Sequence, residues 1–334
     1  MRYEADYAMT EHLIFGVDGL NHDFVQKMIE KGQMRTFEKL QRRRETYYGE
    51  LESFICEGYQ TPHTGPNWTS LYTGLKPKEH GITSGGWNDG DSKFHALNTV
   101  WGAIGGTGKS LYLNGMPMTY KAKPINGKMI SGFVSPTIKS MWDKCVYPDE
   151  FRRAGLPDDY IEYTSSYVAK IKTDGAKPST DTESFWNEIK SSETSRLRIF
   201  NTTYDDEHVV AYGTTLVDKI GHVSGIGTEE NFDERAYILL DEILSTLIDT
   251  CEPDRVTIIS DHGFSEFSHD LNGYCLDSTG RELDTIFDFA PYMRELYDLP
   301  HDDSFFGPNE QDTDRITQEE EDDIKDQLKN MGYF

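Results

Sequence analysis

Three apolar runs in this 334-residue chain end at residues that can bind a metal. LIFGV leads into Asp18, HVVAYGTTLV leads into Asp218, and RVTIIS leads into Asp261 and His262. Carboxylate oxygens and imidazole nitrogens together suit zinc, and they also serve manganese and iron. These residue types therefore indicate a divalent-metal centre if the fold brings the three segments together.

Two more histidines follow these segments. In DKIGH, four positions separate Asp218 from His222, so both side chains share one face if the chain is helical there. His269 lies in FSHDLNG, close enough in sequence to His262 to return to the same site. Simpler explanations remain open: a surface Asp–His pair beside a helix start, a capped turn at SDHGF, and a solvated loop histidine at position 269.

A hydroxyl that can act as a nucleophile lies in PHTGPNWTSLYTGLKPKEHGI. Pro66 is typical of the first turn of a helix and Gly74 of its end, so Thr64 falls at or just before the helix N-terminus. Free N–H groups and the helix dipole favour a phosphate there, and a hydroxyl facing a metal can be activated. The alternative is an ordinary N-cap threonine.

The elements that must position these residues alternate between strand and helix. Besides the apolar runs, FVQKMIEKG and ERAYILLDEILSTLIDT have helical patterns. This order predicts an α/β fold with a mostly parallel central sheet and helices on both faces, with ligands beyond the carboxyl ends of the strands. We expect one domain over residues 1–334, with an inserted cap or elaboration at about 83–195, where periodicity is weak.

The composition of the chain limits the classes of molecule that it is expected to bind. The chain has 58 acidic and 33 basic residues and a formal charge of -25, which disfavours nucleic-acid polymers and anionic membranes. Such an excess resembles the surfaces of proteins from salt-loving organisms. The four cysteines are scattered, which predicts buried, reduced thiols. The sequence contains no signal-peptide pattern and no run long enough to span a bilayer, so we expect a cytoplasmic protein.

GVDG, TGPNWTSLYTGLKPKEHGI, DKIGH and SDHGF, in this order, resemble the alkaline phosphatase superfamily, most closely its type I phosphodiesterase and nucleotide pyrophosphatase branch. The similarity covers nearly the whole chain and implies an alkaline-phosphatase-like fold. It also implies two divalent metals, usually zinc, with manganese or iron as alternatives. The implied ligands are Asp218, His222 and His269 for one metal, and Asp18, Asp261 and His262, completed by Thr64, for the other.

The activity implied by this resemblance is hydrolysis of a phosphodiester or pyrophosphate bond in a small phosphate ester, nucleotides included. Thr64 would attack phosphorus, an alcohol or nucleotide would leave, and water would then hydrolyse the phosphothreonine. Phosphomonoesterase, phosphotransferase and a non-catalytic metal- or nucleotide-binding descendant remain alternatives. A sulfatase is disfavoured because Thr64 replaces the oxidisable residue and no arginine follows at the sulfatase position. Substrate identity and oligomeric state stay open.

Two positions depart from the pattern of this branch. An asparagine that binds a phosphate oxygen commonly follows HGI closely, whereas here Asn88 lies a few positions late and is only a candidate for substrate binding. The last histidine ligand often lies further behind the DHG motif than His269 does, so His301 is the alternative to His269.

The segment IGGTGKSLY resembles the end of a phosphate-binding P-loop. The full GxxxxGK[ST] pattern requires glycine where Ala103 stands. A P-loop also follows a strand and precedes a helix, whereas LNTVWGAI has a helical pattern and SLYLNGM that of a strand. We therefore predict a glycine-rich turn from helix to strand, with Lys109 and Ser110 as ordinary turn residues.

Overall fold

A computed structural model describes residues 10–83, 99–133, 144–148, 173–174, 177–178, 182–226 and 232–299, together with 317–319, 322–323 and 325–326. The helices are α1 (His22–Glu30), α2 (Arg35–Gln41), α3 (Thr64–Thr73), α4 (Pro77–His80), α5 (Val100–Gly106), α8 (Thr182–Thr203), α9 (Leu216–Ser224), α10 (Phe232–Cys251) and α11 (Phe289–Leu296). The strands are β1 (His12–Val17), β2 (Tyr47–Glu52), β3 (Leu111–Asn114), β4 (Gly127–Ile130), β5 (Val146–Tyr147), β6 (Thr173–Asp174), β7 (Lys177–Pro178), β8 (Val209–Thr214), β9 (Arg255–Ile259), β10 (Gly263–Ser265), β11 (Ser268–Asp270) and β12 (Asn272–Asp277).

The described residues form a central sheet of eight strands in the order β2-β12-β9-β1-β8-β3-β4-β5. The five inner strands from β9 to β4 run parallel, whereas β5, β12 and β2 pair antiparallel with their neighbours. All six residues of β1 and of β8 are buried, as expected for parallel strands covered on both faces. The prediction of a mostly parallel α/β sheet is confirmed.

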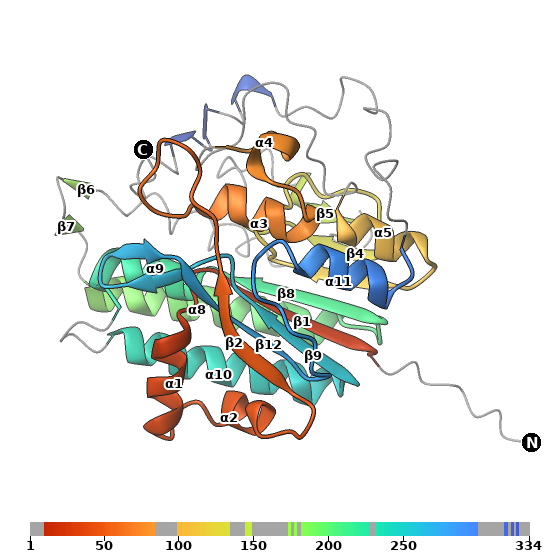
Figure 1. Ribbon diagram of the computed structural model, residues 1–334, viewed down its shortest axis with the longest axis horizontal. Helices are drawn as coiled ribbons and strands as arrows, with labels where there is room; N and C mark the ends of the chain where they lie inside the picture. The colour runs from red at the N-terminus through yellow and green to blue at the C-terminus, as the bar shows by residue number, and fades with distance from the viewer. Residues whose placement is uncertain are drawn as a thin grey trace, which may run out of the picture.

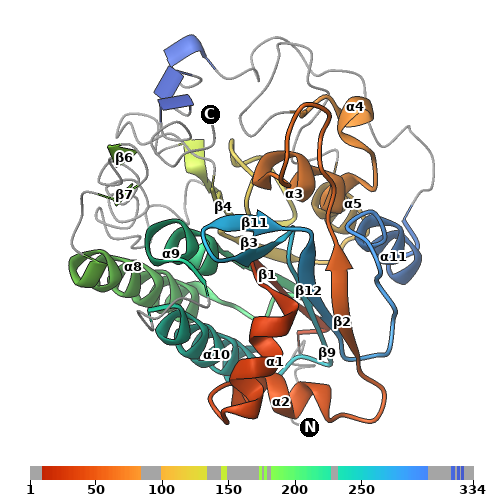
Figure 2. The same cartoon turned by 60° about the vertical axis from the view of Figure 1, so that its left-hand side comes forward.

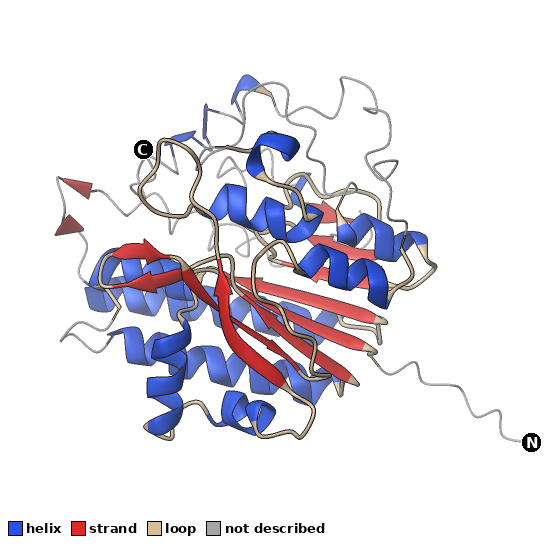
Figure 3. Ribbon diagram, viewed as in Figure 1, coloured by secondary structure: helices blue, strands red, loops and turns tan. Residues whose placement is uncertain are grey.

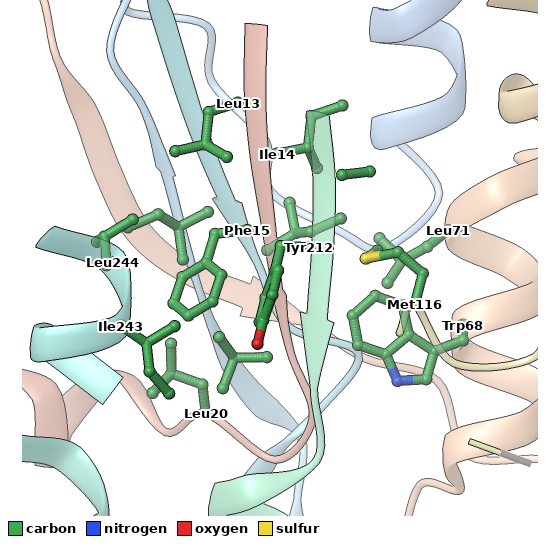
Figure 4. Packing of buried hydrophobic residues seen from close by; sticks show 14 of the residues in the cluster. Leu13, Ile14, Phe15, Leu20, Trp68, Leu71, Met116, Tyr212, Ile243 and Leu244 are labelled. Atoms are coloured by element: carbon green, nitrogen blue, oxygen red, sulfur yellow. The ribbon is translucent and has the colours of Figure 1, made fainter. Parts of the chain in front are cut away.

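Helices cover both faces of this sheet (Figures 1 and 3). Helices α1, α2, α8 and α10 lie on one face, and α3, α5 and α11 on the other. Buried side chains pack on both sides of β1. On one side Phe15 lies beside Ile243 and Leu244 of α10, and on the other lie Trp68 of α3 and Met116 (Figure 4). Trp68 is fully buried, so this tryptophan belongs to the core.

The chain leaves β8 earlier than the sequence predicted. The apolar run before Asp218 was expected to remain a strand up to that residue, but β8 ends at Thr214 and Asp218 lies in the first turn of α9. The reason is local, because the Thr214 hydroxyl accepts a hydrogen bond from the Leu216 N–H at 3.1 Å and turns the backbone into the helix. The apolar residues that follow are buried as helix residues.

Part of the region expected to form a cap contributes to the sheet. Strands β3, β4 and β5 all come from the 83–195 range and extend the sheet beyond β8. The order around IGGTGKSLY is the predicted one, since helix α5 precedes the turn and strand β3 follows it. Gly108 takes a positive φ of 86° in that turn.

Two further expectations concern the thiols and the membrane. All four cysteines are free and buried, as predicted. Within the described part of the chain, none of the helices has both the length and the apolar character needed to cross a membrane.

Candidate metal centre

The predicted ligands come from five segments that meet at the carboxyl ends of the parallel strands, one of them the start of α3 with Thr64. Asp18 follows β1, Asp261 and His262 follow β9 after Ser260, and α9 carries Asp218 and His222. The β10–β11 hairpin supplies His269, and Figure 2 shows β11 between α3 and α9 at this end of the sheet. The structure thus brings together all the residues proposed as ligands from the sequence, apart from candidates outside the described residues.

The loop after β1 and the first turn of α9 are in direct contact. The Asp218 N–H donates to the Asp18 carbonyl at 3.2 Å, and the Asp18 N–H donates to the Thr214 carbonyl at 2.9 Å. Gly19 has a φ of 74°, and a Cβ on it would lie 3.1 Å from the Asp218 Cα. A side chain at position 19 would therefore be strained and would press on the helix that carries Asp218.

One group of potential ligands lies around Asp218. Its Oδ1 is 3.4 Å from His222 Nε2 and 3.0 Å from His269 Nε2, and the two imidazole nitrogens are 3.1 Å apart. Asp218 is 2% exposed and His269 9%, whereas the His222 side chain is 19% exposed. This group therefore lies on the solvent side of the centre.

The second group lies deeper, around His262. His262 Nε2 is 3.4 Å from Asp18 Oδ1, 3.3 Å from Asp261 Oδ2 and 3.3 Å from the Thr64 hydroxyl. The Thr64 hydroxyl also donates to Asp18 Oδ1 at 3.5 Å. Asp18, Asp261 and His262 are fully buried, and Thr64 is 1% exposed. The His262 ring stacks on His269 at 4.0 Å between centroids, so the two groups are adjacent.

The spacing of these atoms fits a pair of divalent cations. Ligand atoms bonded to one tetrahedral zinc ion lie about 3.3 Å from each other, close to the separations in both groups. No N–H or hydroxyl group of the described residues donates to Asp18 Oδ2 or Asp261 Oδ2, although both oxygens are buried. A buried carboxylate oxygen without a donor is costly unless a cation compensates its charge.

The pKa values that the protein chain alone gives its buried carboxyl groups also favour bound cations. Burial raises the pKa of Asp18 well above its usual range, and the negative charge of Asp261 raises it further. Burial, followed by the charge of Asp218, also raises the pKa of Asp261. Burial acts against ionisation of Asp218 too, but His222 and His269 outweigh it and hold the pKa of Asp218 well below the usual range. Bound cations would compensate all three carboxylates.

Two histidines are oriented by backbone carbonyl groups. His262 Nδ1 lies 2.9 Å from the Gly263 carbonyl, and His269 Nδ1 lies 2.7 Å from the Pro62 carbonyl. Because a carbonyl only accepts, each Nδ1 carries the hydrogen and each Nε2 turns its lone pair towards the centre. This is the tautomer that a metal ligand requires.

The helix that carries Thr64 has the predicted limits. Helix α3 begins at Thr64, with His63 at the N-cap position, and ends before Gly74, whose φ is 72°. The first turn of α3 directs backbone N–H groups towards the space in front of Thr64, which favours a negatively charged ligand. Thr64 is therefore the first residue of the helix, next to the deeper group of ligands.

Two residues at this helix start carry no prediction from the sequence. His63 is half-buried, with its ring edge-on to His269 at 6.2 Å, and burial lowers its pKa to about 4. Asn67 is fully buried and fixes the loop before the helix through its side-chain amide. The sequence offers only one signal for them: a polar residue, His63, lies directly before the TGPN segment, and another, Asn67, ends it. Asn88 and His301 lie outside the described residues, so their roles stay predictions.

Lys109 lies at the opposite end of the sheet, just before β3 begins. Its Nζ forms an ion pair with Glu11, with Nζ–oxygen distances of 2.7 and 2.6 Å. Glu11 immediately precedes β1, whose far end leads to Asp18. The full length of the sheet therefore separates Lys109 from the candidate metal centre.

Among the solved structures that resemble this chain, a sulfatase supports the fold. A putative sulfatase from Bacteroides thetaiotaomicron superposes with a TM-score of 0.52 at 10% identity, over 92% of this chain and 76% of the sulfatase chain. Phosphonoacetate hydrolase from Sinorhizobium meliloti matches with a TM-score of 0.46 at 14% identity, over 77% of this chain. The murine ectonucleotide pyrophosphatase/phosphodiesterase 5 matches with a TM-score of 0.44 at 16% identity, over 77% of this chain.

Each match covers a smaller share of the other protein's chain than of this chain. This chain spans 57% of the phosphonoacetate hydrolase chain and 58% of the murine chain. A comparison with curated protein sequences found no match. The model of the type I phosphodiesterase / nucleotide pyrophosphatase family matches residues 12–332, which include every ligand candidate described above. The chain therefore belongs to the type I phosphodiesterase / nucleotide pyrophosphatase family, within the alkaline phosphatase superfamily.

Proposed function

We propose that this protein is a phosphoesterase that cleaves phosphodiester or pyrophosphate bonds through a covalent phosphothreonine at Thr64. The observation that carries the proposal is the position of the Thr64 hydroxyl, 3.3 Å from His262 Nε2 and 3.5 Å from Asp18 Oδ1 at the start of α3. A hydroxyl beside a metal-binding group and a helix N-terminus combines a nucleophile with stabilisation of phosphate charge.

The residues that would hold the cations divide as the distances do. Asp18, Asp261, His262 and Thr64 would hold the deeper one, and Asp218, His222 and His269 the one nearer solvent, with zinc as the first candidate from ligand type and spacing. Bound there, divalent cations stabilise the alkoxide form of a hydroxyl and the negative charge that develops on phosphoryl oxygens.

The protein chain itself supplies positioning in this mechanism. Helix α3 holds the Thr64 oxygen where it can attack phosphorus in line with the departing alcohol or nucleotide. The Thr64 hydroxyl gives its proton to solvent as its oxygen bonds to phosphorus, the bond to the leaving oxygen breaks, and that oxygen takes a proton from solvent. Water then attacks the phosphothreonine, releases phosphate or a phosphate monoester, and regenerates the hydroxyl of Thr64.

The decisive test replaces Thr64 with alanine and with serine. Thr64→Ala should lower turnover of bis-nitrophenyl phosphate by at least on the order of 10³-fold, while Thr64→Ser should retain part of it because a hydroxyl remains. Circular dichroism and bound zinc should show that both variants fold and keep the solvent-side cation. Full activity of Thr64→Ala would exclude Thr64 as the nucleophile.

The same preparations distinguish the alternative functions. A higher rate on nitrophenyl phosphate than on the diester would indicate a phosphomonoesterase, and transfer of phosphate to an added alcohol would indicate a phosphotransferase. Metal content well below two ions per chain, combined with absence of turnover with zinc, manganese or iron, would favour a non-catalytic binding protein.

A further inference from the structure

Phe264 occupies the space behind the solvent-side group of ligands. It is fully buried in β10, directly after His262 and Gly263, and it pairs with His269 across the β10–β11 hairpin. Its ring lies 5.0 Å from the His222 ring at an interplanar angle of 84°, and 5.3 Å from the His269 ring at 70°. One phenyl ring therefore contacts two imidazoles that come from different elements.

Gly221 completes this contact from the side of α9. A Cβ placed on Gly221 would lie 2.6 Å from both Cδ1 and Cε1 of Phe264, and 2.8 Å from its Cγ. Real Cβ atoms do not approach ring atoms that closely, so an alanine at position 221 must displace the ring or the helix. The absence of a side chain at Gly221 lets Phe264 lie directly against α9, next to His222.

We propose that Phe264 is a positioning residue that sets the relative orientation of His222 and His269, and thereby the affinity of the solvent-side cation site. The proposal rests on the proposed function in that it takes the two histidines as metal ligands. The carbonyl of Pro62 fixes Nδ1 of His269, and rotation of the imidazole about that hydrogen bond is opposed by the two rings packed against it, His262 and Phe264. The Phe264 ring restricts this rotation and limits the movement of His222, keeping the two Nε2 atoms near 3.1 Å.

The cation near His262 should not depend on this ring to the same degree. Its carboxylate ligands follow β1 and β9 and are fully buried. His262 is held by the Gly263 carbonyl. Loss of the Phe264 ring should therefore affect the two cations unequally, whereas a general loss of stability would weaken both.

The experiment measures zinc and cobalt(II) binding to the full chain by chelator competition. Wild type should bind two ions. Phe264→Leu and Gly221→Ala should each keep one ion at wild-type affinity and bind the second about 10- to 100-fold more weakly. The visible spectrum of the cobalt(II) protein should change for the weakened site only. Alanine does not lower the helix propensity at position 221, so Gly221→Ala acts through displacement of the Phe264 ring or of α9, and the double variant separates the two.

A matched control and a double variant complete the test. Phe200→Leu removes a fully buried ring that packs on Tyr112 and Tyr212 instead, and should lower stability without changing either affinity. In the Phe264→Leu background, adding Gly221→Ala should cost less affinity than it does in wild type, because the obstructing ring is gone.

The two proposals fail in different ways. Two ions bound at unchanged affinity in Phe264→Leu and Gly221→Ala would overturn the positioning role of Phe264 and leave the proposed function intact. Equal weakening of both ions would also overturn it, since the ring would then act on stability alone. Wild-type protein that binds no divalent ion would overturn the proposed function itself.

Discussion

The side-chain amide of Asn67 donates a hydrogen bond to the carbonyl of His63 at 3.0 Å and so holds the peptide group that leads directly into Thr64. The same side chain accepts from the Phe54 N–H at 3.0 Å and donates to the Phe54 carbonyl at 3.1 Å. Asn67 thus fastens the chain that leaves β2 to the first turn of α3. The position of the proposed nucleophile depends on this connection as well as on the helix.

Asn67→Ala should lower kcat by about one to two orders of magnitude with a smaller change in KM. The substitution leaves the backbone groups of Phe54 and His63 without their side-chain partner, and a displacement of Thr64 by a fraction of an ångström disturbs in-line attack. Thermal unfolding should show that the free energy of unfolding falls by about 1–3 kcal/mol.

Asn126→Ala is the control for Asn67→Ala. Asn126 also donates from its amide to two backbone carbonyls, those of Gly108 and Lys109, at the far end of the sheet. It should affect stability only, with kcat unchanged. Equal kcat losses in the two variants would remove the positioning role assigned to Asn67.

Lys109→Ala should leave kcat and KM nearly unchanged. Lys109 pairs with Glu11 at the end of the sheet opposite the candidate metal centre, and the two side chains are 31% and 40% exposed. A surface ion pair of this kind contributes about 0–1 kcal/mol to folding. Steady-state kinetics checks the prediction, and loss of turnover in a folded variant would restore the P-loop interpretation of IGGTGKSLY.

Stability should fall as the pH is lowered from neutral to 5, in part because of His12. Burial lowers the pKa of His12 from 6.5 to about 3, with the charge of Arg255 adding to the effect. Between these values the unfolded chain binds a proton that the folded protein does not, so folding loses stability as pH falls through 6.5 and towards 3. At pH 5 the loss is about 2 kcal/mol for one such histidine.

Replacement of His12 isolates this contribution. The ring lies 3.0 Å from the Tyr297 hydroxyl and 2.8 Å from the Thr257 hydroxyl, and the amide of glutamine can form similar hydrogen bonds without titrating. His12→Gln should therefore unfold with a shallower dependence on pH in denaturant titrations. An unchanged slope between pH 7.5 and pH 5 would contradict the assignment.

Removal of metal should destabilise the protein more at high pH than at low pH. Asp18 and Asp261 have pKa values raised by burial in the metal-free protein, so they are protonated when folded over a range in which the unfolded chain has lost these protons. These two carboxyl groups therefore contribute a loss of stability to the metal-free protein as pH rises above about 4, opposite in sign to the contribution of His12, and added zinc offsets this loss.

The increase in Tm produced by zinc should accordingly be larger at pH 8 than at pH 5. Competition between protons and zinc for the histidines acts in the same direction. Asp18→Asn removes one of the two like charges, so its metal-free form should depend less on pH. Equal Tm increases at both pH values in wild type would show that the carboxylates do not control stability.

The sequence allowed much of the sheet to be predicted because its inner strands are buried on both faces. LIFGV is a continuous apolar run and RVTII is mostly β-branched, and each is followed by a polar residue beyond the sheet. Strands β3 and β4 are only four residues long and mix polar with apolar residues, so their place in the sheet depends on the pairing of β3 with β8 and of β4 with β3. Pairing between distant segments leaves no local pattern in the sequence.

The candidate ligands could be predicted from the sequence, but the residues that position the proposed nucleophile and ligands could not. Asp261 and His262 stand out because the motif places both directly after a strand, whereas the same pattern led us to place Asp218 at the strand end when it lies in a helix. Asn67 and Phe264 act through contacts with distant residues, which only the folded chain reveals. In the sequence, Phe264 looks like an ordinary core residue and Asn67 like any polar residue in the first turn of a helix.

The position of β1 in the sheet has a consequence for folding during synthesis. β1 lies between β8 and β9, and the ribosome makes both neighbours long after β1 itself. A nascent chain must therefore carry a mostly apolar strand with two open edges until Val209–Thr214 and then Arg255–Ile259 emerge, which is the condition under which strands aggregate. Asp18 is the first of the proposed ligands to be synthesised, and neither proposed site can bind a cation until almost all the other proposed ligands have followed.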